Sequence, residues 1–208
     1  MIPASRGVLL EARFAPGPRN ELVVLCHPHP LFGGTMDNAV VLLLRDALWQ
    51  AGFGTLRYNF RGVGQSRGPY EEAAGEVEDL RVLLRMLAGH EHARDGLHLG
   101  GYSFGAWIAV QACDPGLEPK TLLLVSPPLD FLSFRGATLH TPSCLVVAGD
   151  SDSLCSLASL KRWLRDTPAD CAPELVVLPE CNHFFTSGLD ALRAAVSAFF
   201  GAPGDWQS

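Results

Sequence analysis

The chain has 208 residues, of which 48% are hydrophobic and 18% are charged, and its formal net charge is −6. This composition favours one globular domain over residues 1–208 with a large buried core, and it excludes extended disorder away from the ends. The charges form no basic run that would follow a phosphate backbone, so nucleic acid is excluded as a partner.

The apolar segments and the cysteines exclude further classes of protein. The first residues, Met-Ile-Pro-Ala-Ser-Arg, lack the charged region and apolar core of a secretory signal. The longest apolar runs, such as residues 39–44, are far too short to span a bilayer. None of the six cysteines forms a Cys-x-x-Cys pair, so we expect buried free thiols rather than disulfides or metal knuckles. We therefore expect a soluble, cytoplasmic protein without a membrane span.

Predicted strands and helices alternate along most of the chain. Residues 1–19 are expected to lead in through an antiparallel edge strand or a hairpin, centred on residues 7–14. The elements predicted after this are strand 23–26, helix 38–51, strand 55–60, helix 71–87, strand 97–100, helix 106–110, strands 121–125 and 143–147, helix 156–165, strand 174–178 and helix 188–200. Near-continuous apolar strands separated by helices are typical of a parallel sheet covered on both faces. We therefore predict an α/β fold with a doubly wound, mostly parallel central sheet, followed by a frayed tail at residues 201–208.

The sequence Gly-Tyr-Ser-Phe-Gly at residues 101–105 stands between a predicted strand and a predicted helix. This setting is typical of a nucleophile elbow, in which a serine lies on a very tight turn. The turn forces the serine backbone into a sparsely populated conformation, and side chains two residues to either side would collide across it. Gly101 and Gly105 remove that collision, so Ser103 is the candidate nucleophile.

A serine nucleophile needs a base to take its proton, and His183 is the candidate. It follows the last predicted strand, and a doubly wound sheet places its chemistry at the carboxyl ends of its strands. Two phenylalanines come directly after it and would shield the imidazole from water. Four other histidines have no partner motif and are interpreted as structural: His90, His92, His98 and His140.

Three carboxylates compete for the role of orienting the base. Asp150 and Asp152 follow the predicted strand at 143–147, and Asp130 follows the strand before it. All three lie between Ser103 and His183, so each gives the chain order serine, acid, histidine that is expected of an α/β-hydrolase.

Two other groupings suggest a metal or a phosphate, and we reject both interpretations. His27 and His29 would point to opposite sides of an extended strand, and a metal site built from them with the later aspartates and His183 would leave the elbow unexplained. The glycine-containing loop at residues 59–66 lacks both the dinucleotide fingerprint and a Walker lysine. We expect no metal and no cofactor, and we expect Arg61 in this loop to pair with a local carboxylate.

Together these stretches resemble small, lidless serine hydrolases of the α/β-hydrolase superfamily, in particular the dienelactone-hydrolase-like group. The resemblance covers about residues 20–200 and rests on five motifs: His-Pro-His-Pro at 27–30, Gly-Gly-Thr-Met-Asp-Asn at 33–38, residues 59–66, the elbow at 101–105, and Asn-His-Phe-Phe at 182–185. Dienelactone hydrolase itself uses a cysteine nucleophile, so the serine at 103 points instead to esterase-type chemistry.

The resemblance also implies roles for individual residues. The acid of similar hydrolases lies three residues beyond a glycine, which selects Asp152 and leaves Asp150 to cap or brace its loop. The His-Gly stretch that supplies an oxyanion donor in related enzymes is altered here, and because prolines have no N–H, the donor available is the backbone N–H of His29. Its partner is the N–H of Phe104, directly after the nucleophile. His27 is then expected to hold this loop rigid.

The function predicted from these residues is hydrolysis of an ester or thioester through an acyl-enzyme intermediate. Residues 126–144 are too few for a large lid, so a small-molecule acyl substrate, small or protruding from an open cleft, is expected; residues 129–134 form either one apolar wall or a core-packing loop. Two alternatives are an acyltransferase that uses the same three residues and a non-catalytic binding protein on a hydrolase fold.

Overall fold

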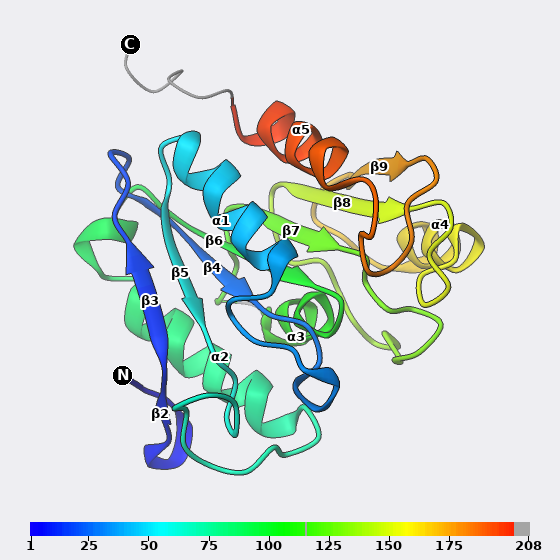
Figure 1. Cartoon of the computed structure of the whole chain (residues 1–208). Helices are drawn as coiled ribbons and strands as arrows, with labels where there is room; N and C mark the ends of the chain where they lie inside the picture. The colour runs from blue at the N-terminus through cyan, green and yellow to red at the C-terminus, as the bar shows by residue number, and fades with distance from the viewer. Residues whose placement is uncertain (115, 202–208) are drawn as a thin grey trace.

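A computed structural model of the chain describes residues 1–114 and 116–201 (Figure 1). Its main sheet has seven strands in the order β3-β5-β4-β6-β7-β8-β9, and all neighbours are parallel except β3 and β5. The strands are β1 Ile2–Pro3, β2 Leu9–Leu10, β3 Ala12–Ala15, β4 Glu21–Cys26, β5 Gly54–Tyr58, β6 Gly96–Tyr102, β7 Leu122–Val125, β8 Cys144–Gly149 and β9 Glu174–Leu178. The helices are α1 Ala39–Gln50, α2 Ala74–Leu87, α3 Phe104–Ala112, α4 Leu157–Asp166 and α5 Leu189–Phe200, with short 3-10 helices η1 Ser5–Gly7, η2 Pro30–Phe32 and η3 Glu91–Ala93. The predicted doubly wound, mostly parallel sheet is confirmed.

Helices cover both faces of the sheet because its central strands are apolar on both sides. In β4, Leu22 and Val24 pack into the core under α2, α3 and α4, whereas Val23 and Leu25 pack into the core under α1 and α5. This alternation follows the two-residue period of a strand. Figure 1 shows α1 and α5 together on one face, with α2 and α3 on the other.

Several predicted boundaries move in the structure. Helix α2 begins at Ala74, not at residue 71, because Glu72 and Ala73 have positive φ angles of 52° and 79°, which a right-handed helix excludes. Strand β6 runs on to Tyr102, and α3 begins at Phe104, so that Ser103 alone separates strand from helix. The predicted edge strand is β3, which pairs antiparallel with β5, and β1 and β2 form a further small pair before it. The predicted tail lies outside the described residues except for Gly201.

The segment between β7 and β8 confirms one expectation about the fold. Residues 126–143, all of which the structure describes, contain neither a helix nor a strand, so no lid domain lies between β7 and β8. Within the described residues, no helix is both long enough and apolar enough to cross a membrane.

The loop after β5 is held by the buried side chain of Arg61. Its guanidinium lies 2.7 Å from the carboxylate of Asp79 in α2 and 2.8 Å from that of Glu71. Because a buried charge is tolerated only when it is paired, these contacts fix the loop against α2. Arg61 therefore has the structural role that the sequence predicts for it, and its charge is already committed.

Candidate active site

Ser103 lies on the tight turn between β6 and α3. Its φ and ψ are 55° and −120°, a sparsely populated region for a residue with a side chain. The turn leaves no space beside it, since a Cβ on Gly101 would lie 2.2 Å from the carbonyl oxygen of Gly105 and a Cβ on Gly105 would lie 2.3 Å from that of Cys26. Gly101 is therefore required across the turn, as the sequence predicts, whereas Gly105 is required because α3 packs closely against the end of β4.

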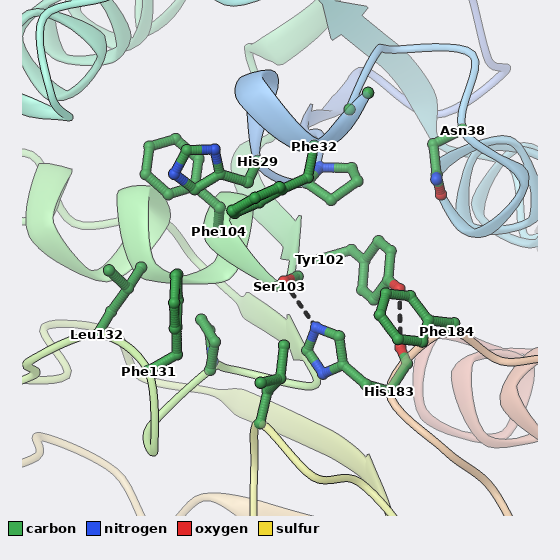
Figure 2. Close-up of a pocket in the computed structure, with 15 residues that line it drawn as sticks. His29, Phe32, Asn38, Tyr102, Ser103, Phe104, Phe131, Leu132, His183 and Phe184 are labelled. Atoms are coloured by element: carbon green, nitrogen blue, oxygen red, sulfur yellow. Dashed lines mark hydrogen bonds between the residues drawn. The ribbon is translucent and has the colours of Figure 1, made fainter.

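The structure brings Ser103, His183 and Asp152 into one chain of hydrogen bonds. Oγ of Ser103 lies 2.8 Å from Nε2 of His183, drawn as a dashed line in Figure 2, and Nδ1 of His183 lies 2.9 Å from each carboxylate oxygen of Asp152. Asp152 and His183 come from the loops after β8 and β9, and all three side chains are buried. A histidine held in this way has Nε2 free to accept the serine proton.

The environment of Asp152 keeps its carboxylate ionised. Burial alone would raise the pKa of this carboxyl, but the hydrogen bonds that it accepts, from His183 above all, together with the charge of His183 outweigh burial, and the resulting pKa is lower than usual. The N–H groups of Leu154 and Cys155 also donate to Oδ1 over 2.9 Å each. The carboxylate thus has fixed partners on both sides and is oriented toward the imidazole.

The other two candidate acids lie elsewhere. Asp150 is exposed, and its carboxylate accepts a hydrogen bond from the hydroxyl of the neighbouring Ser151. Asp130 accepts from the backbone N–H of Ser156 over 2.7 Å and from the hydroxyl of Ser159, at the start of α4. A carboxylate at a helix N-terminus is a stabilising feature, so Asp130 has a structural explanation of its own.

The remaining histidines have partners or positions away from Ser103. His98 is buried in β6 beside Glu21, and His140 lies 3.3 Å from Asp170. His90 and His92 stack on each other around η3. Within residues 1–114 and 116–201, no three His, Cys, Asp or Glu side chains are placed to hold a metal ion.

The loop after β4 is rigidified by His27, as expected. Its Nδ1 lies 2.6 Å from the carbonyl oxygen of Pro28, and its Nε2 accepts the N–H of Phe60 over 3.0 Å. Burial lowers the pKa of His27 to about 4, so the ring is neutral and both nitrogens are engaged. His27 therefore connects the end of β4 to the end of β5 and does not reach the substrate side.

His29 and Phe104 meet beside Ser103. Their rings are 4.6 Å apart between centroids, and the His29 ring also has Nε2 3.3 Å from the hydroxyl of Tyr70 and Nδ1 as the acceptor of the Leu31 N–H. The loop closes tightly on itself, because a Cβ on Gly34 would lie only 2.0 Å from the carbonyl oxygen of Pro28. Phe104 is the first residue of α3, so its N–H has no partner within the helix.

A pocket of about 400 Å³ opens over Ser103 and is lined mainly by apolar side chains (Figure 2). Phe32, Phe131 and Phe184 stand at its rim and are 75%, 53% and 69% exposed. Phe131 and Leu132 come from the segment after β7, which therefore forms one apolar wall, while Phe134 of the same segment packs in the core. Both interpretations of residues 129–134 thus hold for different side chains.

Sequence reasoning missed two polar lining residues, Tyr102 and Asn38. The hydroxyl of Tyr102 donates to the backbone carbonyl of His183 over 2.7 Å and holds the loop that carries this histidine. Burial raises the pKa of Tyr102 above its usual range, so the hydroxyl stays a donor. The position of Tyr102 directly before the nucleophile could have indicated that its side chain lies close to the site. Its partner, the carbonyl of His183, could not be predicted, because it depends on where β9 lies in the sheet.

The chain is similar to a known protein family, to a curated protein and to several solved structures. Residues 18–133 match the family described as serine aminopeptidase, S33. An uncharacterised protein of Rickettsia prowazekii is 31% identical over 199 residues, which cover 91% of this chain and 83% of that protein. Two solved structures are similar over their whole length. An α/β serine hydrolase without a lid from Xanthomonas campestris is 29% identical, covers 95% of this chain and 94% of its own, and has a TM-score of 0.83. An α/β serine hydrolase homologue from Coxiella burnetii is 32% identical, covers 96% and 99%, and has a TM-score of 0.81.

Proposed function

The chain belongs to the serine aminopeptidase S33 family of the α/β-hydrolase superfamily, and from this premise we propose that it hydrolyses an ester or thioester of a small or protruding acyl substrate. The observation that carries the proposal is the 2.8 Å contact between Oγ of Ser103 and Nε2 of His183, with Asp152 behind the imidazole. A hydroxyl becomes a strong nucleophile only when a base takes its proton, and this pair supplies both groups.

In the proposed reaction, His183 takes the proton of Ser103 as Oγ attacks the acyl carbonyl carbon. The N–H groups of His29 and Phe104 stabilise the resulting oxyanion, a contribution typically worth about 3 kcal/mol for each donor. His183 then donates its proton to the leaving group, and an acyl enzyme remains on Ser103. Water, deprotonated by the same imidazole, attacks this acyl group and releases the acid and the free serine.

The lining of the pocket favours an acyl substrate over a peptide with a free amino terminus. An aminopeptidase must hold the positive charge of that amine, which calls for a carboxylate facing the substrate. None of the side chains that line the pocket in the described part of the chain is an aspartate or a glutamate. The apolar walls instead match a hydrocarbon acyl group, for which burial of apolar area supplies binding energy.

A fluorophosphonate probe tests the proposed chemistry directly. We expect the probe to label the folded protein at one position, and peptide mapping should find the adduct on Ser103, because among the described serines it alone has an imidazole against its hydroxyl. Absence of labelling in protein shown to be folded would favour the non-catalytic binding protein. Labelling together with dominant transfer of the acyl group to a low concentration of added alcohol would favour the acyltransferase.

The wall formed by Phe131 should set the preference for acyl length. The rings of Phe32 and Phe131 are 6.3 Å apart between centroids, close enough for an alkyl chain to lie against both. With p-nitrophenyl acetate, butyrate and hexanoate, we expect Phe131→Ala to lower kcat/KM for the hexanoate about tenfold and for the acetate hardly at all, because each buried CH₂ is worth about 0.8 kcal/mol.

Leu31→Ala is the matched control for this measurement. Leu31 is 68% exposed and adjacent to Phe32, but it does not line the pocket, so its loss should leave the length profile unchanged. Equal losses for acetate and hexanoate in Phe131→Ala would show that this ring does not contact the acyl chain.

A further inference from the structure

Asn38 stands out among the residues that line the pocket because it is the residue just before α1, and Figure 2 shows it at the edge of the pocket beyond Tyr102. Its Oδ1 accepts the N–H of Val40 over 3.0 Å, which makes it the N-cap of the helix. That bond defines the orientation of the amide. The oxygen accepts from the backbone of α1, and the NH₂ group points away from that backbone N–H.

The other polar side chains of the pocket already have hydrogen-bond partners within the protein. The Tyr102 hydroxyl donates to the carbonyl of His183, and both ring nitrogens of His29 have partners. Ser103 and His183 are the proposed reacting pair. Among the described residues, no acceptor takes a hydrogen bond from Nδ2 of Asn38. Apart from the reacting pair, this NH₂ group is therefore the side-chain donor that the described lining residues leave for a ligand.

The position of Asn38 indicates which part of a substrate it faces. Asn38 precedes α1, and His183 and Phe184 precede α5, and these two helices pack together on the same face of the sheet. Figure 2 shows Asn38 on the same side of Ser103 as Tyr102 and Phe184, across from Phe131 and Leu132. Because His183 must reach the leaving group to protonate it, the leaving group lies on the His183 side and the acyl group on the other.

We propose that Asn38 determines specificity by donating a hydrogen bond from Nδ2 to an oxygen acceptor in the leaving group of the substrate. The inference rests on the proposed esterase function and narrows it to esters whose alcohol or thiol part carries an ether, carbonyl or hydroxyl oxygen. The apolar acyl part remains against Phe32 and Phe131. An amide that already caps a helix loses little freedom on binding, so it is well placed to discriminate.

Two variants remove the donor while preserving the helix cap. Asn38→Asp has the same shape and an equally good capping oxygen, and Asn38→Ser keeps a capping oxygen without adding a charge. Both should unfold at nearly the temperature of the wild type. In Asn38→Asp, an acceptor faces the substrate in place of the donor, whereas in Asn38→Ser the side chain is too short to reach it.

The measurement compares kcat/KM for matched butyrate esters with and without an ether oxygen in the alcohol part. The pairs are 2-methoxyethyl against n-butyl and 3-methoxypropyl against n-pentyl, which place the oxygen at two depths. We expect the preference for the ether ester of at least one pair to fall about three- to tenfold in both variants, the effect of losing one hydrogen bond between neutral groups. The ratio isolates the acceptor, because any general effect of the substitution on the pocket acts on both esters of a pair.

A third pair of n-butyl esters, methoxyacetate against butyrate, places the oxygen in the acyl part, and its ratio should not change. If all ratios stay the same in both variants, Asn38 does not contact the substrate. If only the methoxyacetate ratio changes, the assignment to the leaving group is wrong. Failure of the esterase function itself gives a different result, since the wild-type protein would then hydrolyse none of these esters.

Discussion

Replacement of Ser103 by alanine is expected to lower kcat for the best p-nitrophenyl ester by about 10⁴- to 10⁶-fold, with the fold intact. The alanine keeps the backbone of the turn, where φ is 55°, and removes only the oxygen that lies 2.8 Å from Nε2 of His183. On the proposed mechanism no acyl enzyme forms without that oxygen, and the residual rate comes from water activated by the imidazole beside the proposed oxyanion donors.

Ser151→Ala is the matched control for this replacement. Ser151 lies in the loop that carries Asp152, and its exposed hydroxyl donates only to Asp150, so its loss should leave kcat within about twofold of the wild type, as expected for a surface substitution. Thermal unfolding of both variants establishes that they are folded. Turnover by Ser103→Ala above one tenth of the wild-type value would remove this serine from the mechanism.

The sheet was predictable because the central parallel strands are buried on both faces. In β7, for example, Leu122 and Leu124 pack on one side while Leu123 and Val125 pack on the other, so a continuous apolar run is the only pattern that suits the strand. The start of α2 was not predictable, since nothing in the local sequence forces Glu72 and Ala73 into positive φ. These two residues lie between Glu71 and Asp79, which are both partners of Arg61, a buried residue earlier in the chain.

Part of the candidate site was likewise predictable from the sequence, and part was not. Strand ends that share one edge of a parallel sheet bring Ser103, Asp152 and His183 near one another, and this much follows from chain order and topology. The residues that line the pocket do not follow from chain order and topology. Asn38 and Phe184 reach the space over Ser103 because α1 and α5 pack together, and a contact between two helices so far apart in the chain leaves no periodic trace in the sequence.

The choice between the two neighbouring aspartates has a direct test in a pair of isosteric replacements. Asp152→Asn is expected to lower kcat about 10³- to 10⁴-fold. The neutral amide does not balance the charge of the imidazolium, and its NH₂ group does not hold the proton of His183 on Nδ1. The proton then lies on Nε2, which can no longer accept the proton of the Ser103 hydroxyl. Asp150→Asn changes the same charge two residues away, on an exposed side chain, and should keep kcat within about twofold of the wild type. Measured at several pH values, the two variants separate orientation of the base from a general effect of charge near the site. A large loss in Asp150→Asn with little in Asp152→Asn would show that the loop rearranges during turnover and that the other carboxylate serves the histidine.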